Sequence, residues 1–151
     1  MSKSYQVTAQ VRFVNRIMIQ LLRWGVALPN YSLLTVRGRK SGQYFTLPVT
    51  LVERDSQRWL VSPYGEGNWV KNARAAGEVS LFRAGKREMV SLHELGPQES
   101  APVLKEYITK VAITRPYFQV AFDAPLEDFI REAPLHPVFL IEAADSSQGK
   151  V

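Results

Sequence analysis

Apolar residues recur at helical spacing in the first part of the chain, and this pattern predicts a helix from Gln6 to Val26. The helix is expected to stop near Gly25, and the Pro29-Asn30 pair breaks the chain after it. The main apolar stripe has three arginines on its opposite side and three large apolar residues that widen it. The stripe is Val7, Val11, Val14, Met18 and Leu21, the arginines are Arg12, Arg16 and Arg23, and the widening residues are Phe13, Ile17 and Trp24. Such a helix either packs on the domain with its arginines in water, or lies on an anionic membrane as a basic amphipathic helix.

Runs rich in β-branched and aromatic residues, bounded by turn-forming residues, predict six strands. They are Ser32–Arg37, Tyr44–Val52, Trp59–Pro63, Val79–Arg83, Arg87–Leu95 and Pro137–Ala143. Tight turns at Gly38–Gly42, Asp55-Ser56 and Ala84-Gly85 separate neighbouring strands, and such short connections favour antiparallel pairing. Pro48 has no N–H to donate, so it should lie at an edge or a bulge.

Four further segments have the character of helices. They are Trp69–Ala76, Pro97–Val111, Thr114–Ala121 and Leu126–Ala133. Asn68 is positioned to cap the first of them and Gly77 to end it. Strands with helices inserted between them predict an α+β domain with a small antiparallel barrel at its centre. Residues 1–30 form the N-terminal helix of this one domain, 31–144 the barrel with its helical cap, and 145–151 a flexible tail.

Composition narrows the possible chemistry. The chain of 151 residues contains no cysteine, which excludes disulfides, thiolate metal sites and a cysteine nucleophile. His93 and His136 lie far apart in sequence, so no protein-bound metal is expected. No signal peptide is evident and no run is apolar enough to span a membrane, which predicts a cytoplasmic protein. The net charge of +5 favours an anionic partner.

The turn Gly38–Gly42 is the strongest local signal of ligand binding. Its glycines allow the backbone to expose N–H groups, Arg39 offers a planar fork to phosphate oxygens, Lys40 a mobile charge and Ser41 a hydroxyl. The spacing is not that of a Walker A loop. The alternative interpretation is an ordinary solvated hairpin turn.

Two further clusters are candidates for a site. The Gly-rich stretch from Ser62 to Trp69 leads into a helix that carries Lys71 and Arg74, where backbone N–H groups and positive charge could meet an anion. Trp69 either stacks on a planar ring or belongs to the core. The aromatic cluster of Tyr107, Tyr117, Phe118, Phe122 and Phe129 either lines a substrate pocket or forms a second core. Because no Ser-His-Asp set or carboxylate pair is evident, a cofactor would have to supply the chemistry.

Read together, these pieces resemble the split β-barrel family of deazaflavin-dependent nitroreductases and quinone reductases, which is typical of actinobacteria. The matching segments, in order, are LLTVRGRKSGQ at 33–43, TLPV at 46–49, WLVS at 59–62 and NWVKNARAAGEVSL at 68–81. The resemblance weakens after Leu95. It implies a split β-barrel that binds coenzyme F420 and passes a hydride from the reduced form to an electron-poor acceptor such as a quinone, an enone or a nitro compound.

The resemblance also implies roles for individual residues. The cofactor's phosphate and acidic tail would contact Arg39, Lys40, Ser41, Gly42 and Lys71, while Trp69 and Asn72 would flank the cofactor. Ser62 would lie beside the deazaflavin ring and assist protonation, with Tyr117 as the other candidate acid. The acceptor pocket would be lined by Tyr117, Phe118 and Phe122.

Some features depart from the family pattern and leave alternatives open. Pro63 stands where a basic residue often follows the serine, and the segment Arg115–Gln119 has fewer tyrosines than the family's nitroreductases. The same barrel could hold FMN, whose shorter tail needs fewer basic contacts. A non-catalytic ligand-binding or membrane-binding protein is the alternative from another class, and nucleic acid is not an expected partner. The protein is expected to be a monomer or a homodimer.

Overall fold

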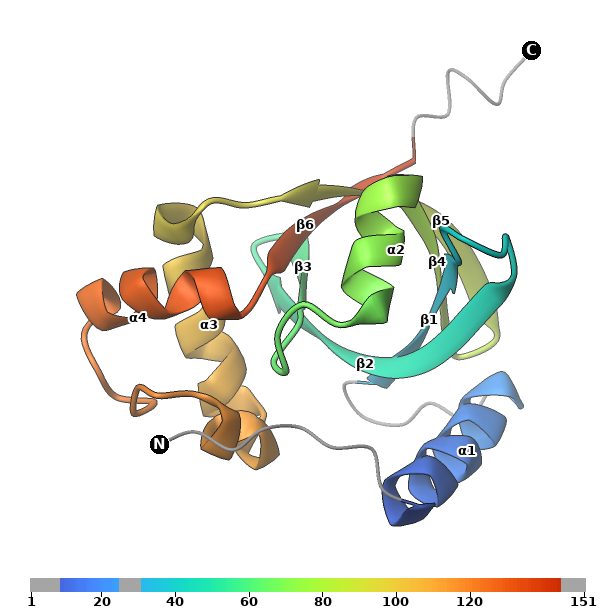
Figure 1. Ribbon diagram of the computed structural model, residues 1–151, viewed down its shortest axis with the longest axis horizontal. Coiled ribbons are helices and arrows are strands. Elements are labelled where there is room, and N and C mark those ends of the chain that lie inside the picture. The colour runs from blue at the N-terminus through green and yellow to red at the C-terminus, as the bar shows by residue number, and fades with distance from the viewer. Residues whose placement is uncertain (1–8, 25–30, 145–151) are drawn as a thin grey trace.

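A computed structural model describes residues 9–24 and 31–144 of the chain (Figure 1). Six antiparallel strands close into a barrel in the order β1-β2-β3-β6-β5-β4. The strands are β1 (Tyr31–Arg37), β2 (Tyr44–Arg54), β3 (Gln57–Val61), β4 (Glu78–Arg83), β5 (Lys86–Glu94) and β6 (Val138–Ala143). The predicted α+β fold with a small six-stranded antiparallel barrel is therefore confirmed.

Pro48 lies where the strand pairing can tolerate a missing N–H. It is opposite Leu33 of β1, whereas β3 pairs with β2 only from Leu51 to Arg54. One edge of β2 therefore has no strand partner at Pro48, which confirms its expected edge position.

The helix α2 (Asn68–Ala76) lies across the barrel opening in Figure 1 and buries Val70 and Ala73 against the barrel core. Asn68 does not cap this helix as predicted. It is the first helical residue, Gly67 holds the cap position, and no side chain bonds the free N–H groups there. The predicted end at Gly77 is confirmed, since Gly77 adopts φ +77° and donates its N–H to the Ala73 carbonyl at 2.8 Å.

A second core lies outside the barrel, beneath the helices α3 (Pro97–Lys110) and α4 (Leu126–Glu132). Two 3₁₀ helices complete this cap, η1 (Ala112–Tyr117) and η2 (Ala133–Leu135). The helix predicted at Thr114–Ala121 is in fact the shorter η1, because extended backbone begins at Phe118. In Figure 1 the cap stands beside the β3–β6 side of the barrel, away from α1.

The helix α1 (Ala9–Arg23) contacts β1, β2 and β4. Met18 and Leu21 are half-buried, but three large apolar residues point to solvent: Phe13 is 61% exposed, Ile17 46% and Trp24 75%. At 100° per residue these three share one side of the helix, so they form a separate exposed ridge and do not widen the packed stripe. No helix among the described residues is long and apolar enough to cross a membrane.

The predictions for Val7, Gly25, the Pro29-Asn30 break and the tail at 145–151 fall outside the described residues.

Candidate functional site

The basic turn between β1 and β2 is held by its own backbone. Gly38 donates its N–H to the Gln43 carbonyl at 2.6 Å, and Gly42 donates to the Gly38 carbonyl at 3.0 Å. Gly42 has φ +75°, a conformation that favours glycine. A Cβ on Gly38 would lie 2.7 Å from the Phe45 ring and 3.1 Å from the Gln43 oxygen, so both glycines have structural reasons for their places.

Asn72 joins this turn to α2. Its side chain is buried, and its Oδ1 accepts hydrogen bonds from the Arg39 backbone N–H at 3.1 Å and from Arg39 Nη1 at 2.7 Å. Both the backbone and the guanidinium of Arg39 are therefore fixed from α2. The direct contact of Asn72 with a cofactor stays a prediction; the contact that is present positions Arg39.

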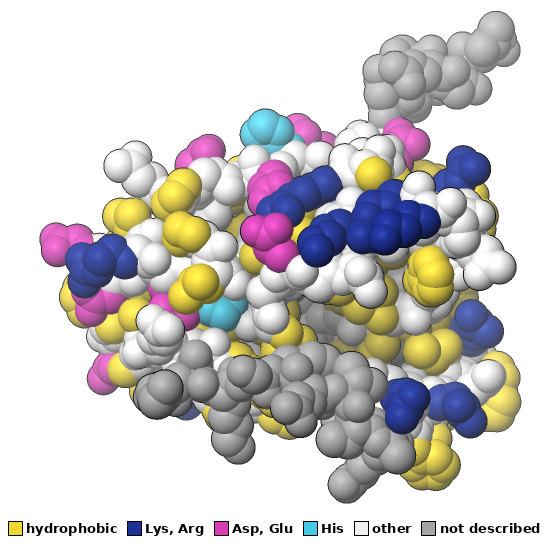
Figure 2. All heavy atoms as spheres, viewed as in Figure 1, with side chains coloured by type: hydrophobic (Ala, Val, Ile, Leu, Met, Phe, Trp, Pro, Cys, Tyr) yellow, Lys and Arg dark blue, Asp and Glu magenta, His cyan; other side chains and the backbone are white. Residues whose placement is uncertain are grey.

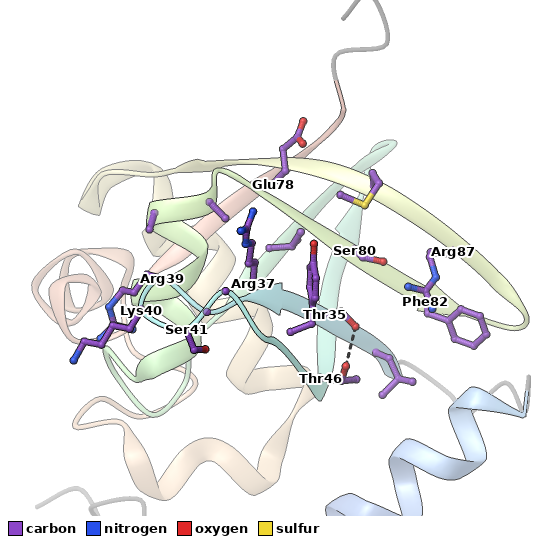
Figure 3. A pocket seen from close by; sticks show the side chains of 18 of the residues that line it. Thr35, Arg37, Arg39, Lys40, Ser41, Thr46, Glu78, Ser80, Phe82 and Arg87 are labelled. Carbon is purple, nitrogen blue, oxygen red and sulfur yellow. Dashed lines mark hydrogen bonds between the residues drawn. The ribbon is translucent and has the colours of Figure 1, made fainter. Parts of the chain in front are cut away.

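Two cavities share the turn as part of their lining. The larger, about 1400 Å³, is an open groove over the outward faces of β1, β2, β4 and β5 (Figure 3). The smaller, about 350 Å³, lies between the turn and the start of α2. Residues 38–41 line both cavities; Phe45, Asn68, Trp69 and Asn72 complete the smaller one. Trp69 is also half-buried against the barrel core, with its ring 6.1 Å from that of Phe139. Its packing on the core is therefore shown, and its stacking on a planar ring stays a prediction.

The groove carries positive charge that no carboxylate neutralises by direct contact. Its lining includes Arg23, Arg37, Arg39, Lys40 and Arg87, with Glu78 as the single acidic residue in that lining. Among the described residues, none of these five cations forms an ion pair. In Figure 3, Arg39 and Lys40 lie at one end of the groove and Arg87 at the other. An anion with several charges spread along its length would fit this lining.

Other arginines are paired, which makes the groove distinct. Arg58, for example, donates twice to Glu88, and this pairing lowers the pKa of the Glu88 carboxyl. Arg74 is also paired, because it donates hydrogen bonds to the carboxylates of Glu94 and Glu66. The expectation that Arg74 adds free positive charge for a ligand is therefore wrong, since β5 and the loop before α2 each bring a carboxylate to it. Figure 2 shows the Lys and Arg side chains gathered over α2 with acidic side chains beside them.

Lys71 and Ser62 lie outside the lining of both cavities. Lys71 is exposed on α2. The Ser62 residue is 2% exposed, and its hydroxyl donates a hydrogen bond to the Gly65 carbonyl at 2.5 Å. Its backbone N–H donates to the Pro137 carbonyl at 2.9 Å, which ties the end of β3 to the start of β6.

The fold brings Tyr117 to the loop that follows Ser62. The Tyr117 ring meets the Tyr64 ring edge-on, with the centroids 4.8 Å apart. Phe122 is partly exposed, and the Arg115 guanidinium lies over its ring, with Arg115 Cζ 4.1 Å from the ring centroid. The pocket-lining roles of Tyr117 and Phe122 stay predictions.

Phe118 belongs to the second core in this structure, together with Tyr107 and Phe129. It is 5% exposed and stacks on His136 with the ring centroids 3.8 Å apart. Burial raises the pKa of the Tyr107 phenol, which keeps that hydroxyl protonated. For these three aromatic residues the core interpretation is the one that their burial supports, and Phe118 backs the Tyr117 segment from behind.

Sequence reasoning missed several residues that line the groove, above all Arg37 and Arg87. Arg37 directly precedes the recognised turn, so its position could have been inferred. Arg87 is distant in sequence and reaches the groove only because β4 pairs with both β1 and β5. Among the described residues no cluster of three or more His, Cys, Asp or Glu could hold a metal ion.

The described residues form a small closed barrel whose sheet carries a groove of unpaired cations, a lining that suits an extended anionic ligand. The sequence model of a family described as F420H(2)-dependent quinone reductase matches residues 7–124. This match spans most of the chain, so the chain belongs to that family and is an F420H2-dependent reductase of the split-barrel fold.

Two solved structures with TM-scores of 0.50 and 0.55 have a similar fold. One described as a domain-swapped dimer is 22% identical, with a TM-score of 0.50, and the match covers 89% of this chain and 100% of that one. A protein of unknown function from Agrobacterium tumefaciens is 14% identical, with a TM-score of 0.55 and coverage of 91% and 57%. An F420-H2-dependent reductase, FDR-A, is 24% identical, with a TM-score of 0.49 and coverage of 77% and 97%. The comparison with curated proteins gave no match.

We predict that Asn72→Ala destabilises the protein by about 1–3 kcal/mol, because it leaves the Arg39 N–H without its partner. Urea unfolding followed by Trp fluorescence measures the loss. Asn68→Ala is the matched control, since Asn68 lies on the same helix and makes no capping bond. Equal stability of the two variants would show that the Asn72–Arg39 contact contributes nothing.

Proposed function

We propose that the chain uses reduced coenzyme F420 to reduce an electron-poor small molecule, a quinone, an enone or a nitro compound. The observation that carries the proposal is the row of unpaired cations that starts at a preorganised turn and continues along the groove. Family membership supports the cofactor class. FMN is the alternative cofactor, and its single phosphate would engage only part of such a row.

The turn holds the anionic part of the cofactor. Arg39 is oriented by Asn72 before any ligand arrives, so less conformational entropy is lost when it binds phosphate. Lys40 adds a mobile charge, and Ser41 adds a hydroxyl at the same cavity wall. Gly42 lines the groove as well, but its own N–H closes the turn on the Gly38 carbonyl. Arg37 and Arg87 extend the positive lining for an acidic tail, while Lys71 acts from the surface of α2.

The smaller cavity suits a planar group because Trp69 and Phe45 offer aromatic faces there. The bound cofactor supplies the hydride. The chain contributes orientation of the reactants and exclusion of water from them.

Tyr117 is the stronger candidate for the proton donor to the reduced acceptor. It is half-buried beside the loop that follows β3. The other candidate, Ser62, is almost fully buried and already donates its hydrogen to Gly65. Ser62 could donate elsewhere only after its hydroxyl released the Gly65 carbonyl.

The exposed ridge on α1 favours a second function, attachment to an anionic membrane surface. Phe13, Ile17 and Trp24 are exposed on one side of a helix that also presents Arg12, Arg16 and Arg23 to solvent. Apolar groups that can enter the interface, next to cations that can meet lipid phosphates, are the combination that such binding needs. A membrane-bound reductase would meet an apolar acceptor such as a quinone directly.

A homodimer is compatible with this proposal, and one similar structure is a domain-swapped dimer. Whether this chain is a monomer or a homodimer stays a prediction.

We expect Lys40→Ala to weaken binding of the deazaflavin cofactor about 3- to 10-fold at low salt, because one phosphate or carboxylate contact is lost. Equilibrium titration followed by intrinsic fluorescence measures the change, and the difference should shrink as salt is added. Lys110→Ala, an exposed lysine at the end of α3, is the control. Unchanged affinity at low salt would remove Lys40 from the site.

A parallel titration with FMN separates the two cofactors. Binding of the deazaflavin alone supports the proposal, whereas binding of FMN alone would keep the fold and replace the chemistry. If neither cofactor bound, the proposed function would be wrong.

Replacing Tyr117 with Phe should lower acceptor turnover about 10²-fold or more, since a positioned general acid contributes on that scale. Cofactor affinity should stay unchanged, because the Tyr117 ring lies outside both cavities. Steady-state kinetics on a quinone acceptor gives kcat, and titration gives the affinity. Ser62→Ala tests the second candidate, and full activity in both variants would leave solvent as the proton source.

The Phe13→Ser/Trp24→Ser variant should lose sedimentation with vesicles that contain anionic lipid, because it removes the apolar ridge of α1. The wild-type protein should sediment with those vesicles and not with neutral ones. Ile113→Ser is the control, as Ile113 is 76% exposed on η1. Failure of the wild-type protein to sediment would leave α1 as a helix that only packs on the barrel.

A further inference from the structure

A buried histidine–glutamate pair lies beneath the segment that carries Tyr117. His136 and Glu132 are each 3% exposed, and His136 Nε2 lies 2.7 Å from Glu132 Oε2. They sit at the end of α4 and just after η2, where the chain returns to the barrel. The proposed cofactor groove and the proposed proton donors make no use of this pair.

The pair holds the two residues that follow Tyr117. Glu132 Oε2 also accepts the backbone N–H of Gln119 at 3.1 Å. The imidazole of His136 lies nearly parallel to the Phe118 ring, with 13° between the planes and 3.8 Å between the centroids. One side chain therefore fixes a ring of this segment and the other fixes its backbone.

The same stretch of chain also holds the end of β3. Pro137, next to His136, accepts the N–H of Ser62 at 2.9 Å, and an ideal Cβ on Gly65 would lie 3.7 Å from the Leu135 carbonyl oxygen. Residues 135–137 thus contact both the loop that begins at Ser62 and, through His136, the segment that carries Tyr117. The relative placement of these two segments depends on this stretch.

Burying the His136–Glu132 pair costs folding free energy that an apolar core would not cost. Ionisable groups lose their hydration on burial, and apolar residues of similar size often replace such pairs without loss of stability. His136 Nδ1 adds to the cost, because it is buried without a hydrogen-bond partner among the described residues. When Glu132 is a carboxylate, Nε2 must carry the hydrogen that it shares with Oε2. Directional hydrogen bonds, which apolar side chains cannot supply, are what the pair provides.

We propose that His136 and Glu132 are positioning residues, which hold the Tyr117–Gln119 segment in a fixed place against the loop that follows Ser62. The proposal rests on the proposed function in so far as Tyr117 acts on the acceptor. The hydrogen bond from Gln119 to Glu132 and the stacking of Phe118 on His136 are contacts within the protein, so they can be tested without a cofactor.

The decisive variant replaces both polar groups with apolar ones, Glu132→Leu/His136→Phe. It keeps a ring against Phe118 and leaves no buried charge without a partner, so it should fold with a Tm close to that of the wild-type protein. Hydrogen exchange of the peptide that contains Gln119, measured on the ligand-free protein, should nevertheless become at least 10-fold faster. For the acceptor reaction, kcat should fall about 10-fold while the cofactor Kd stays within twofold.

Two further variants separate positioning from general stability. His136→Gln retains a donor toward Glu132, so both the hydrogen exchange of the Gln119 peptide and kcat should stay within about threefold of the wild-type values. Val103→Ala opens a void in the same core and leaves both side chains of the pair in place, so it should lower Tm and leave kcat and local exchange at Gln119 unchanged.

The outcomes decide between the readings. Wild-type exchange and wild-type kcat in the double variant would overturn the proposal, and so would a Val103→Ala variant that reproduced its effects. Faster exchange with unchanged kcat would overturn the role in the reaction. If the double variant failed to fold, the single variants His136→Gln and Glu132→Leu would be compared instead. Wild-type exchange and kcat in His136→Gln, with faster exchange and lower kcat in Glu132→Leu, would support the proposal. Equal behaviour of the two variants would overturn it. If the wild-type protein reduced no acceptor with the deazaflavin cofactor, the proposed function would fail, while the exchange data would still show whether the pair holds the segment.

Discussion

The hydrogen bonds from Arg39 to the Asn72 side chain connect the two parts on which the site depends. Asn72 belongs to the helix that closes the barrel, and Arg39 belongs to the turn that carries unpaired charge into both cavities. Because the amide oxygen accepts from the backbone and the guanidinium together, the turn cannot shift relative to α2 without breaking both bonds. The buried Asn72 amide therefore fixes the backbone and the guanidinium of a basic turn in one arrangement, which the proposed binding of an anion would use.

The distribution of ion pairs supports the same conclusion. A protein with a net charge of +5 has too few carboxylates to pair every cation, and where the unpaired cations lie is informative. Arg58 and Arg74 meet carboxylates from other elements, whereas Arg37 and Arg87 meet none among the described residues. Like charges gathered along one groove repel each other, and an anionic ligand that bound there would remove this repulsion.

Features that depend on neighbouring residues could be predicted from the sequence, and features that depend on distant ones could not. The strands and the basic turn follow from local alternation and glycine placement. The predicted ends of all six strands lie within two residues of the ends in the structure. Arg74 was misjudged because its partner Glu94 arrives from β5, twenty residues away. The sequence left both a pocket and a core role open for Phe118, because its burial depends on residues distant in sequence, among them His136 and the other members of the second core. The cap at Asn68 failed for a smaller reason: glycine at position 67 serves as the cap without a side chain.

The loop between β3 and α2 links the two halves of the candidate site. At one end Ser62 is tied to β6 through Pro137, and at the other Asn68 lines the smaller cavity. Between them Tyr64 packs against Tyr117, and Glu66 pairs with Arg74. Arg74 lowers the pKa of the Glu66 carboxyl, so this contact persists at neutral pH, though its exposure makes it weak. The loop thus contacts α2, which borders the proposed cofactor cavity, and Tyr117, the proposed proton donor. The Ser62 hydroxyl bonds the Gly65 carbonyl and Tyr117 packs on Tyr64, so both candidate proton donors contact this one loop through adjacent residues.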